Sequence, residues 1–143
     1  MAVLLVRHAA AGDRDAWDAP DQLRPLDGHG LAQAESLVDL LAGFPVERVL
    51  SSPYLRCTQT VEPLAAARGL EVEPCEELAE GGAAAALVLV RRLLEGPGVV
   101  LCTHGDVMEA VLDGRGVSRT RETEKGATWA VEPGAARYLP PPE

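Results

Sequence analysis

The chain has 143 residues, of which 47% are hydrophobic, and its 13 basic and 22 acidic residues give a net charge of −9. This length favours one domain, expected over residues 1–139 with a short Pro-rich tail at 140–143. The negative charge argues against binding of a nucleic-acid polymer and against docking on anionic lipid. No apolar run is long enough to span a membrane, and the start MAVLLVRH is too short for a signal peptide. We therefore expect a cytoplasmic protein.

The N-terminal region predicts a strand, a long loop and a helix. AVLLV at 2–6 is an apolar run of strand length, typical of a buried parallel strand. Residues 9–27 are rich in Asp, Gly and Pro and predict a long loop, a feature that is usually functional in a compact domain. Residues 28–43 predict an amphipathic helix with Asp27 as N-cap. Its expected buried face comprises Leu31, Ala34, Val38 and Leu41.

The next region predicts a strand at 46–50 followed by a helix over 53–68. Ser52 and Pro53 match an N-cap followed by proline at the first helical position. Pro63 lies within the helix, and we expect it to kink or divide the helix near Glu62, because proline removes a backbone hydrogen bond.

The remaining pattern alternates strands and helices. It predicts a short strand at 70–72, helices at 83–95 and 106–113, a strand at 99–103, and two edge strands at 128–131 and 135–139. Trp129 is expected to pack into the core at one of these edges. The alternation predicts the α/β class, as a three-layer α/β/α sandwich around a mainly parallel central sheet.

Three predicted strands end in residues suited to binding phosphate. The first ends in Arg7-His8, the second leads through Ser52 to Arg56, and another ends in Thr103-His104. Parallel strands present their carboxyl ends at one rim, where ligands bind in such sheets. Twelve of the thirteen basic residues are Arg, and the guanidinium fork matches phosphate oxygens in a bidentate manner. The sequence therefore predicts an oxyanion site at this rim.

The same residues suit phosphoryl transfer without a metal. A neutral imidazole is a nucleophile at pH 7, and neighbouring Arg charges should lower the pKa of His8 and keep it neutral. Cys57, Cys75 and Cys102 form no pair with metal-ligand spacing. We expect free thiols, with Cys102 buried in its strand, and neither a metal nor another cofactor.

Four segments together resemble the histidine phosphatase, or phosphoglycerate mutase-like, superfamily. They are LLVRHA (4–9), RPLDGHGLAQAE (24–35), VLSSPYLRCTQT (49–60) and VLCTHGDV (100–107). The short chain and Arg24-Pro25-Leu26 resemble the SixA-type phosphohistidine phosphatases. RCTQTVEPLAA (56–66) and KGATW (125–129) are even more similar to the phosphatase-like domain attached to some Nudix hydrolases. The family has glycine where this chain has Ala9, and a side chain there could move a backbone N–H away from the ligand.

The resemblance implies roles for particular residues. His8 becomes the nucleophile that forms phosphohistidine, Arg7 and Arg56 clamp the phosphoryl oxygens, and His104 contacts the transferring group. The family's general acid is a carboxylate. Glu80, in Leu78-Ala79-Glu80, is the first candidate for this acid, and Glu77 is the alternative. The competing interpretation is that both glutamates are ordinary solvated charges of a loop. Further contacts with the substrate are expected from Arg14, Arg24 and Lys125. The alternative for each of these residues is a charge that is exposed on the surface or has a structural role.

These residues predict a metal-independent phosphatase with a covalent phosphohistidine intermediate. The SixA resemblance implies phosphohistidine on a protein as substrate, whereas the Nudix-associated resemblance implies nucleotides or other small phosphorylated metabolites. The alternative from another functional class is a regulatory module that binds phosphate without catalysis. A mutase fits less well, because this chain lacks the additional residues with which mutases enclose a small substrate. The expected partner is a phosphorylated protein or small molecule, and the expected state is a monomer or weak dimer.

Overall fold

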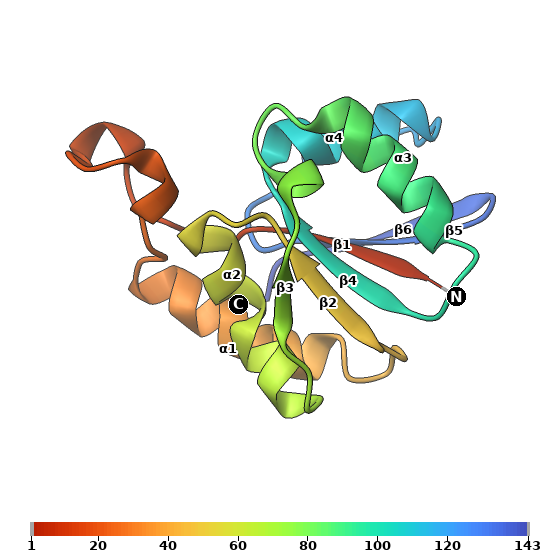
Figure 1. Cartoon of the computed structure of the whole chain (residues 1–143), viewed down its shortest axis with the longest axis horizontal. Coiled ribbons are helices and arrows are strands. Elements are labelled where there is room, and N and C mark those ends of the chain that lie inside the picture. Colours follow the sequence, from red (N-terminus) through yellow and green to blue (C-terminus); the bar gives the residue numbers. More distant parts are fainter. Residues whose placement is uncertain (1, 143) are drawn as a thin grey trace.

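A computed structural model describes residues 2–142, which form a six-stranded sheet in the order β3-β2-β4-β1-β5-β6 (Figure 1). The strands are β1 (Val3–Arg7), β2 (Arg48–Ser51), β3 (Val72–Pro74), β4 (Val99–Thr103), β5 (Thr128–Glu132) and β6 (Ala135–Leu139). β3, β2, β4 and β1 are mutually parallel, whereas β5 is antiparallel to β1 and to β6. The mainly parallel sheet is confirmed.

Helices cover both faces of this sheet. α1 (Gly28–Leu40) and α2 (Leu55–Ala67) pack together on one face, and α3 (Ala83–Leu93) and α4 (Gly105–Gly114) pack together on the other (Figure 1). Short 3-10 turns lie at Arg14–Ala16, Asp21–Leu23 and Glu76–Leu78. The expected three-layer α/β/α sandwich is therefore confirmed.

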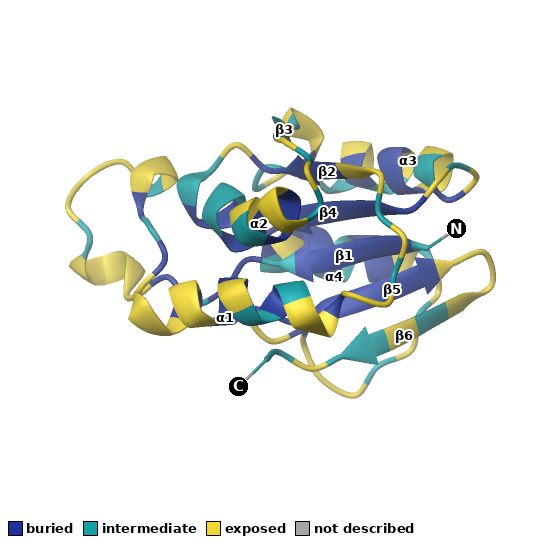
Figure 2. Ribbon diagram, turned by 90° about the horizontal axis from the view of Figure 1, so that it is seen from below, coloured by how far each residue is buried: buried dark blue, intermediate teal, exposed yellow. Residues whose placement is uncertain are grey.

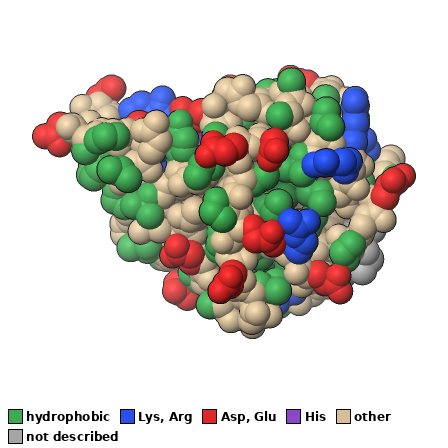
Figure 3. All heavy atoms as spheres, in the orientation of Figure 1, with side chains coloured by type: hydrophobic (Ala, Val, Ile, Leu, Met, Phe, Trp, Pro, Cys, Tyr) green, Lys and Arg blue, Asp and Glu red, His purple; other side chains and the backbone are tan. Residues whose placement is uncertain are grey.

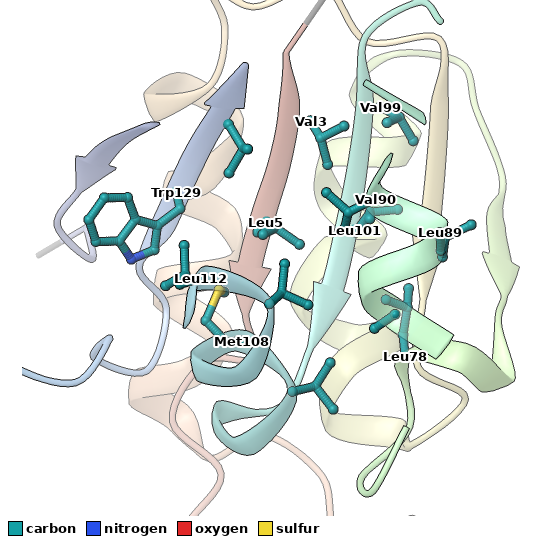
Figure 4. Close-up of a cluster of buried hydrophobic side chains, with 14 of the residues drawn as sticks. Val3, Leu5, Leu78, Leu89, Val90, Val99, Leu101, Met108, Leu112 and Trp129 are labelled. Carbon is teal, nitrogen blue, oxygen red and sulfur yellow. The ribbon is translucent and has the colours of Figure 1, made fainter. Parts of the chain in front are cut away.

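The central strands are buried on both faces, which explains their unbroken apolar sequence. In β1, Val3 and Leu5 belong to the core beneath α3 and α4, while Leu4 and Val6 belong to the core beneath α1 and α2. Figure 4 shows the first of these cores, in which Leu101 of β4 joins Val3 and Leu5. Two cores holding one rigid sheet fix the positions of the strand ends.

The predicted buried face of α1 is correct for Ala34 and Leu41 and wrong for Leu31 and Val38. Leu31 is half exposed and Val38 is only partly buried, whereas the helix buries Gly30, Gln33, Ala34 and Leu37. Gly30 packs so closely on the loop that a Cβ would lie 1.9 Å from the carbonyl oxygen of Ala10. This close backbone contact explains the burial of Gly30, a position that the hydrophobic pattern did not include. The predicted cap is present, since Asp27 accepts a 2.8 Å hydrogen bond from the N–H of Gly30.

The predictions for α2 also need correction. The helix begins at Leu55 with Tyr54 as N-cap, so Ser52 is not the cap and Pro53 precedes the helix. The helix also continues through Pro63 to Ala67 without being divided. Val61 and Leu64, on either side of Pro63, are fully buried, and this packing compensates for the hydrogen bond that proline removes.

β5 is an interior strand, contrary to the prediction of two edge strands. It pairs with β1 on one side and β6 on the other, so only β6 lies at the edge. The alternating burial of β6 contrasts with the buried β1, β4 and β5 (Figure 2). Trp129 does pack into the core, and its indole N–H donates to Thr123 Oγ1.

The surface agrees with the acidic composition. On the face in Figure 3, acidic and basic side chains are interspersed among hydrophobic ones. Among residues 2–142, none of the helices combines the length and apolarity needed to cross a bilayer.

Candidate active site

A cavity of about 620 Å³ opens at the carboxyl ends of the central strands. Arg7 and His8 enter it from the end of β1, and His104 and Gly105 from the end of β4. The loop between β1 and α1, which projects beyond the sheet in Figure 1, contributes Arg14 and Arg24. The parallel connections thus bring together residues that are about a hundred positions apart in the chain.

His8 is buried with one ring nitrogen fixed by the backbone. Its Nδ1 donates a 2.9 Å hydrogen bond to the carbonyl of Ala9, so Nε2 keeps its lone pair. Burial lowers the pKa of His8 most; the Ala9 hydrogen bond partly raises it, and the charges of Arg56, His104 and Arg7 lower it further, to about 3. His8 is therefore a neutral imidazole at physiological pH, as a nitrogen nucleophile must be.

This lowered pKa predicts a pH-dependent stability. The unfolded chain binds a proton at His8 below about pH 6.5, whereas the folded chain does so only near pH 3. Stability contributed by neutral His8 is complete above pH 6.5 and declines as the pH falls, by about 1 kcal/mol per pH unit between pH 5.5 and 4. Urea unfolding should show a weaker pH dependence for His8→Asn than for the wild type in this window. Equal slopes would contradict the assignment.

Arg56 is fully buried and is held by the loop and by the segment before α3. Its guanidinium donates to the carbonyl of Asp21 at 2.9 Å, to Asp21 Oδ2 at 3.0 Å and to Glu80 Oε1 at 2.9 Å. Partial burial raises the pKa of Asp21, but hydrogen bonds from Arg24 and Arg56 outweigh this and lower it. Asp21 is therefore a charged anchor that positions Arg56, a role that the loop sequence did not indicate.

Arg7 lies against a glycine that makes room for it. A Cβ at Gly105 would come within 2.8 Å of Arg7 Cζ, so only glycine permits this approach. One guanidinium nitrogen of Arg7 donates to the carbonyl of Thr123. The glycine in Thr103-His104-Gly105 is the only sequence signal of this contact.

His104 is positioned by Ser52, across the neighbouring strand. Ser52 Oγ lies 2.8 Å from His104 Nε2 and also accepts from the N–H of Tyr54 at 3.3 Å. Cys57 Sγ lies 3.6 Å from the same nitrogen, so two polar side chains hold this edge of the His104 ring. Nδ1 lies 3.6 Å from Glu80 Oε1. The sequence indicated Ser52 only as a helix cap, because its contact with His104 is formed across two strands.

Removal of this hydroxyl should reduce activity without abolishing it. In Ser52→Ala the tautomer and orientation of His104 are no longer fixed, so we expect kcat to fall about tenfold with little change in KM. Ser52→Thr, which keeps the hydroxyl, should retain more activity than Ser52→Ala. Steady-state kinetics on a phosphomonoester checks this, and equal activity of Ser52→Ala and wild type would contradict the role.

Of the two candidate acids, the structure brings only Glu80 to the cavity. Glu80 Oε1 accepts from Arg56 and from Arg14, at 2.9 and 2.8 Å. Glu77 is exposed, accepts from Cys75 Sγ, and does not line this cavity. Arg14 thus joins the loop to Glu80.

The other two candidate contacts also line the cavity. Arg24 is buried and donates to the carbonyl of Ala11 and to Asp21. Lys125 is exposed and belongs to the turn before β5.

Ala9 does not require the conformational freedom of glycine. Among the described residues no residue other than glycine has a positive φ, so Ala9 lies in ordinary backbone space. Its N–H donates to Thr60 Oγ1 at 2.9 Å, and Thr60 in turn donates to the carbonyl of Arg56. Its methyl group packs with Ala11, Leu26 and Ala34. The replacement of glycine is therefore accommodated without strain.

Three buried nitrogens at this site have no hydrogen-bond partner within residues 2–142. They are Arg7 Nε, Arg56 Nε and His104 Nδ1. A buried polar nitrogen without a partner is costly, and these three belong to the residues whose charges lower the pKa of His8.

A family model confirms the resemblance drawn from the motifs. The model of the histidine phosphatase superfamily (branch 1) matches residues 3–87. The chain belongs to this superfamily. Membership in this superfamily agrees with the expectation of a hydrolase.

Similar proteins of known name add detail. SixA from Agrobacterium tumefaciens is 26% identical, with a TM-score of 0.77 covering 96% of this chain and 95% of that one. A protein histidine phosphatase SixA solved with tungstate is 25% identical, with a TM-score of 0.79 covering 97% and 94%. An 8-oxo-(d)GTP phosphatase from Mycolicibacterium smegmatis is 36% identical over 99% of this chain and 48% of its own length. The chain thus spans about half the length of that curated relative.

Proposed function

We propose that this chain is a metal-independent phosphatase that forms a covalent phosphohistidine on His8. The observation that carries the proposal is the buried neutral imidazole of His8, which lines the cavity together with Arg7 and His104 and lies near the fully buried guanidinium of Arg56. Such preorganised donors stabilise charge that develops on equatorial phosphoryl oxygens. Tungstate in a similar SixA structure is also a tetrahedral oxyanion.

The reaction has two steps. His8 Nε2 attacks phosphorus in line, a P–N bond forms, and the bond to the leaving oxygen breaks. Water then attacks the phosphohistidine, the P–N bond breaks, and inorganic phosphate leaves. Glu80 is the group placed to handle protons in both steps, since its Oε1 lies 3.6 Å from His104 Nδ1. In the state described here it only accepts hydrogen bonds, from Arg14 and Arg56.

We favour a small phosphorylated molecule of the nucleotide class as substrate. The 36% identical relative is named an 8-oxo-(d)GTP phosphatase, and a cavity of about 620 Å³ has room for a nucleotide. Phosphohistidine on a protein is the second candidate, supported by the likeness to SixA structures.

A panel of substrates separates these candidates. The chain is incubated with p-nitrophenyl phosphate, with nucleotides, and with a phosphorylated histidine-containing carrier protein, each with and without EDTA. We expect hydrolysis that EDTA does not reduce and a higher kcat/KM for nucleotides than for the carrier. Faster dephosphorylation of the carrier would select the second candidate, and no hydrolysis of any compound would overturn the phosphatase proposal.

A further inference from the structure

Lys125, the single lysine of the chain, is held beside the nucleophile by backbone hydrogen bonds. The N–H of the next residue, Gly126, donates to the carbonyls of both Arg7 and His8 at 3.1 Å. Gln33 reaches the carbonyl of Lys125 at 3.4 Å, and Gly126 has a φ of +83°. The turn is thus anchored to the end of β1, and it presents an ammonium group at the wall of the same cavity.

The surroundings of this ammonium are positive. Partial burial lowers the pKa of Lys125, and the charges of Arg7, Arg24 and Arg56 lower it further. Among residues 2–142 no carboxylate lies within ion-pair distance of Lys125 or Arg7, whereas Arg24 and Arg56 both pair with Asp21. Lys125 and Arg7 are therefore two cations without an ion-pair partner that line the same cavity as His8, and the more distant charge of Asp27 only partly raises the pKa of Lys125. An anion bound in the cavity would offset their repulsion.

A single phosphoryl group does not contact all of the positively charged side chains at the cavity. In the proposed function, Arg7, Arg56 and His104 surround the phosphoryl group that His8 attacks, and Lys125 is left without a partner. The same cavity is also lined by the carboxylates of Asp106, Glu109 and Glu122. Negative charge on a substrate is repelled by these carboxylates, so a second phosphate is expected to bind where the free ammonium of Lys125 can reach it.

We propose that Lys125 forms a second phosphate subsite, so that the substrate class is a diphosphate ester such as a nucleoside diphosphate. The inference rests on the proposed function and adds to it the substrate's second phosphate. His8 Nε2 forms a bond to the terminal phosphorus, the bridging P–O bond breaks, and its electron pair stays on the departing monophosphate. Water then releases inorganic phosphate from His8, so one water is consumed for each diphosphate cleaved.

A phosphate leaving group reduces the need for a general acid. A departing phosphate spreads its negative charge over several oxygens, and Lys125 stabilises it directly. The leaving oxygen then needs no proton from a general acid. With such a leaving group, the proton transfer proposed for Glu80 is needed only in the second step, when water attacks the phosphohistidine.

The test compares GDP with GMP as substrates for the wild type, Lys125→Met and Arg91→Met. Arg91 is an exposed residue of α3 outside the cavity, so its replacement removes the same charge at a distance from the site. We expect the wild type to prefer GDP in kcat/KM by about tenfold or more, because a charge-assisted contact contributes about that factor. Lys125→Met should lose most of this preference, mainly through KM for GDP, and Arg91→Met should keep it.

Binding to a variant that does not turn over provides an independent measurement. Calorimetry on His8→Ala should show tighter binding of pyrophosphate than of phosphate, and the added Lys125→Met change should remove the difference. If the wild type cleaves GMP and GDP equally well and Lys125→Met lowers both alike, the second subsite is refuted and the phosphatase proposal stands. If the wild type cleaves neither these nor any other phosphate ester, the proposed function itself fails.

Discussion

His8→Ala is expected to lower kcat for phosphomonoester hydrolysis by about 10³-fold or more, because no other imidazole can take over the attack. His104, the other imidazole at the site, has its ring centroid 5.6 Å from that of His8 and its Nε2 hydrogen-bonded to Ser52. The wild type should also accumulate a phosphoprotein that is stable in base and labile in acid. Rapid quench with a ³²P-labelled substrate, followed by peptide mapping, should locate the label at His8.

The third histidine of the chain provides a matched control. His29 is exposed in the first turn of α1, outside the cavity. His29→Ala should therefore retain the wild-type rate and the labelled intermediate. Full hydrolysis by His8→Ala, or label recovered from another residue of that variant, would refute His8 as the nucleophile.

Arg56→Ala is expected to lower kcat/KM by about 10²–10³-fold, since it removes a preorganised donor for the phosphoryl oxygens. The same change leaves Asp21 and Glu80 without their buried partner. We expect a loss of stability of about 2–4 kcal/mol, near the lower end for a broken buried ion pair, because both carboxylate side chains are 31% exposed. Arg56→Lys should recover part of the stability and little of the activity, because an ammonium lacks the bidentate fork.

Arg48 is the matched control for Arg56. It pairs with Glu73 on the surface, where both side chains are nearly half exposed, at the amino end of β2 and away from the cavity. Arg48→Ala should change both activity and stability only slightly. Steady-state kinetics with urea unfolding measures both quantities. Arg56→Ala activity within threefold of the wild type would contradict the clamp.

The strands and most helices were predictable because their signals are local. β1 and β4 are apolar runs between polar segments, and Asp27 caps α1 as its position before the helix indicates. The errors arose where a distant residue overrode the local signal. Ser52 contacts His104 instead of capping α2, and Gly30 is buried against the carbonyl of Ala10. Contacts of this kind do not change the hydrophobic periodicity of the sequence, so the sequence pattern does not predict them.

The central strands and their order along the chain followed from the sequence by itself, and so did the meeting of Arg7, His8 and His104 at one rim. Apolar runs separated by helices have few ways to bury both faces, and parallel connections place the strand ends on one side. Only the tertiary structure decided which loop charges reach that rim. It brings Glu80 but not Glu77 to the cavity, joins Asp21 to Arg56, and anchors the turn that holds Lys125 to the end of β1. Those side chains lie on irregular segments, whose direction is set by contacts with residues far away in the chain.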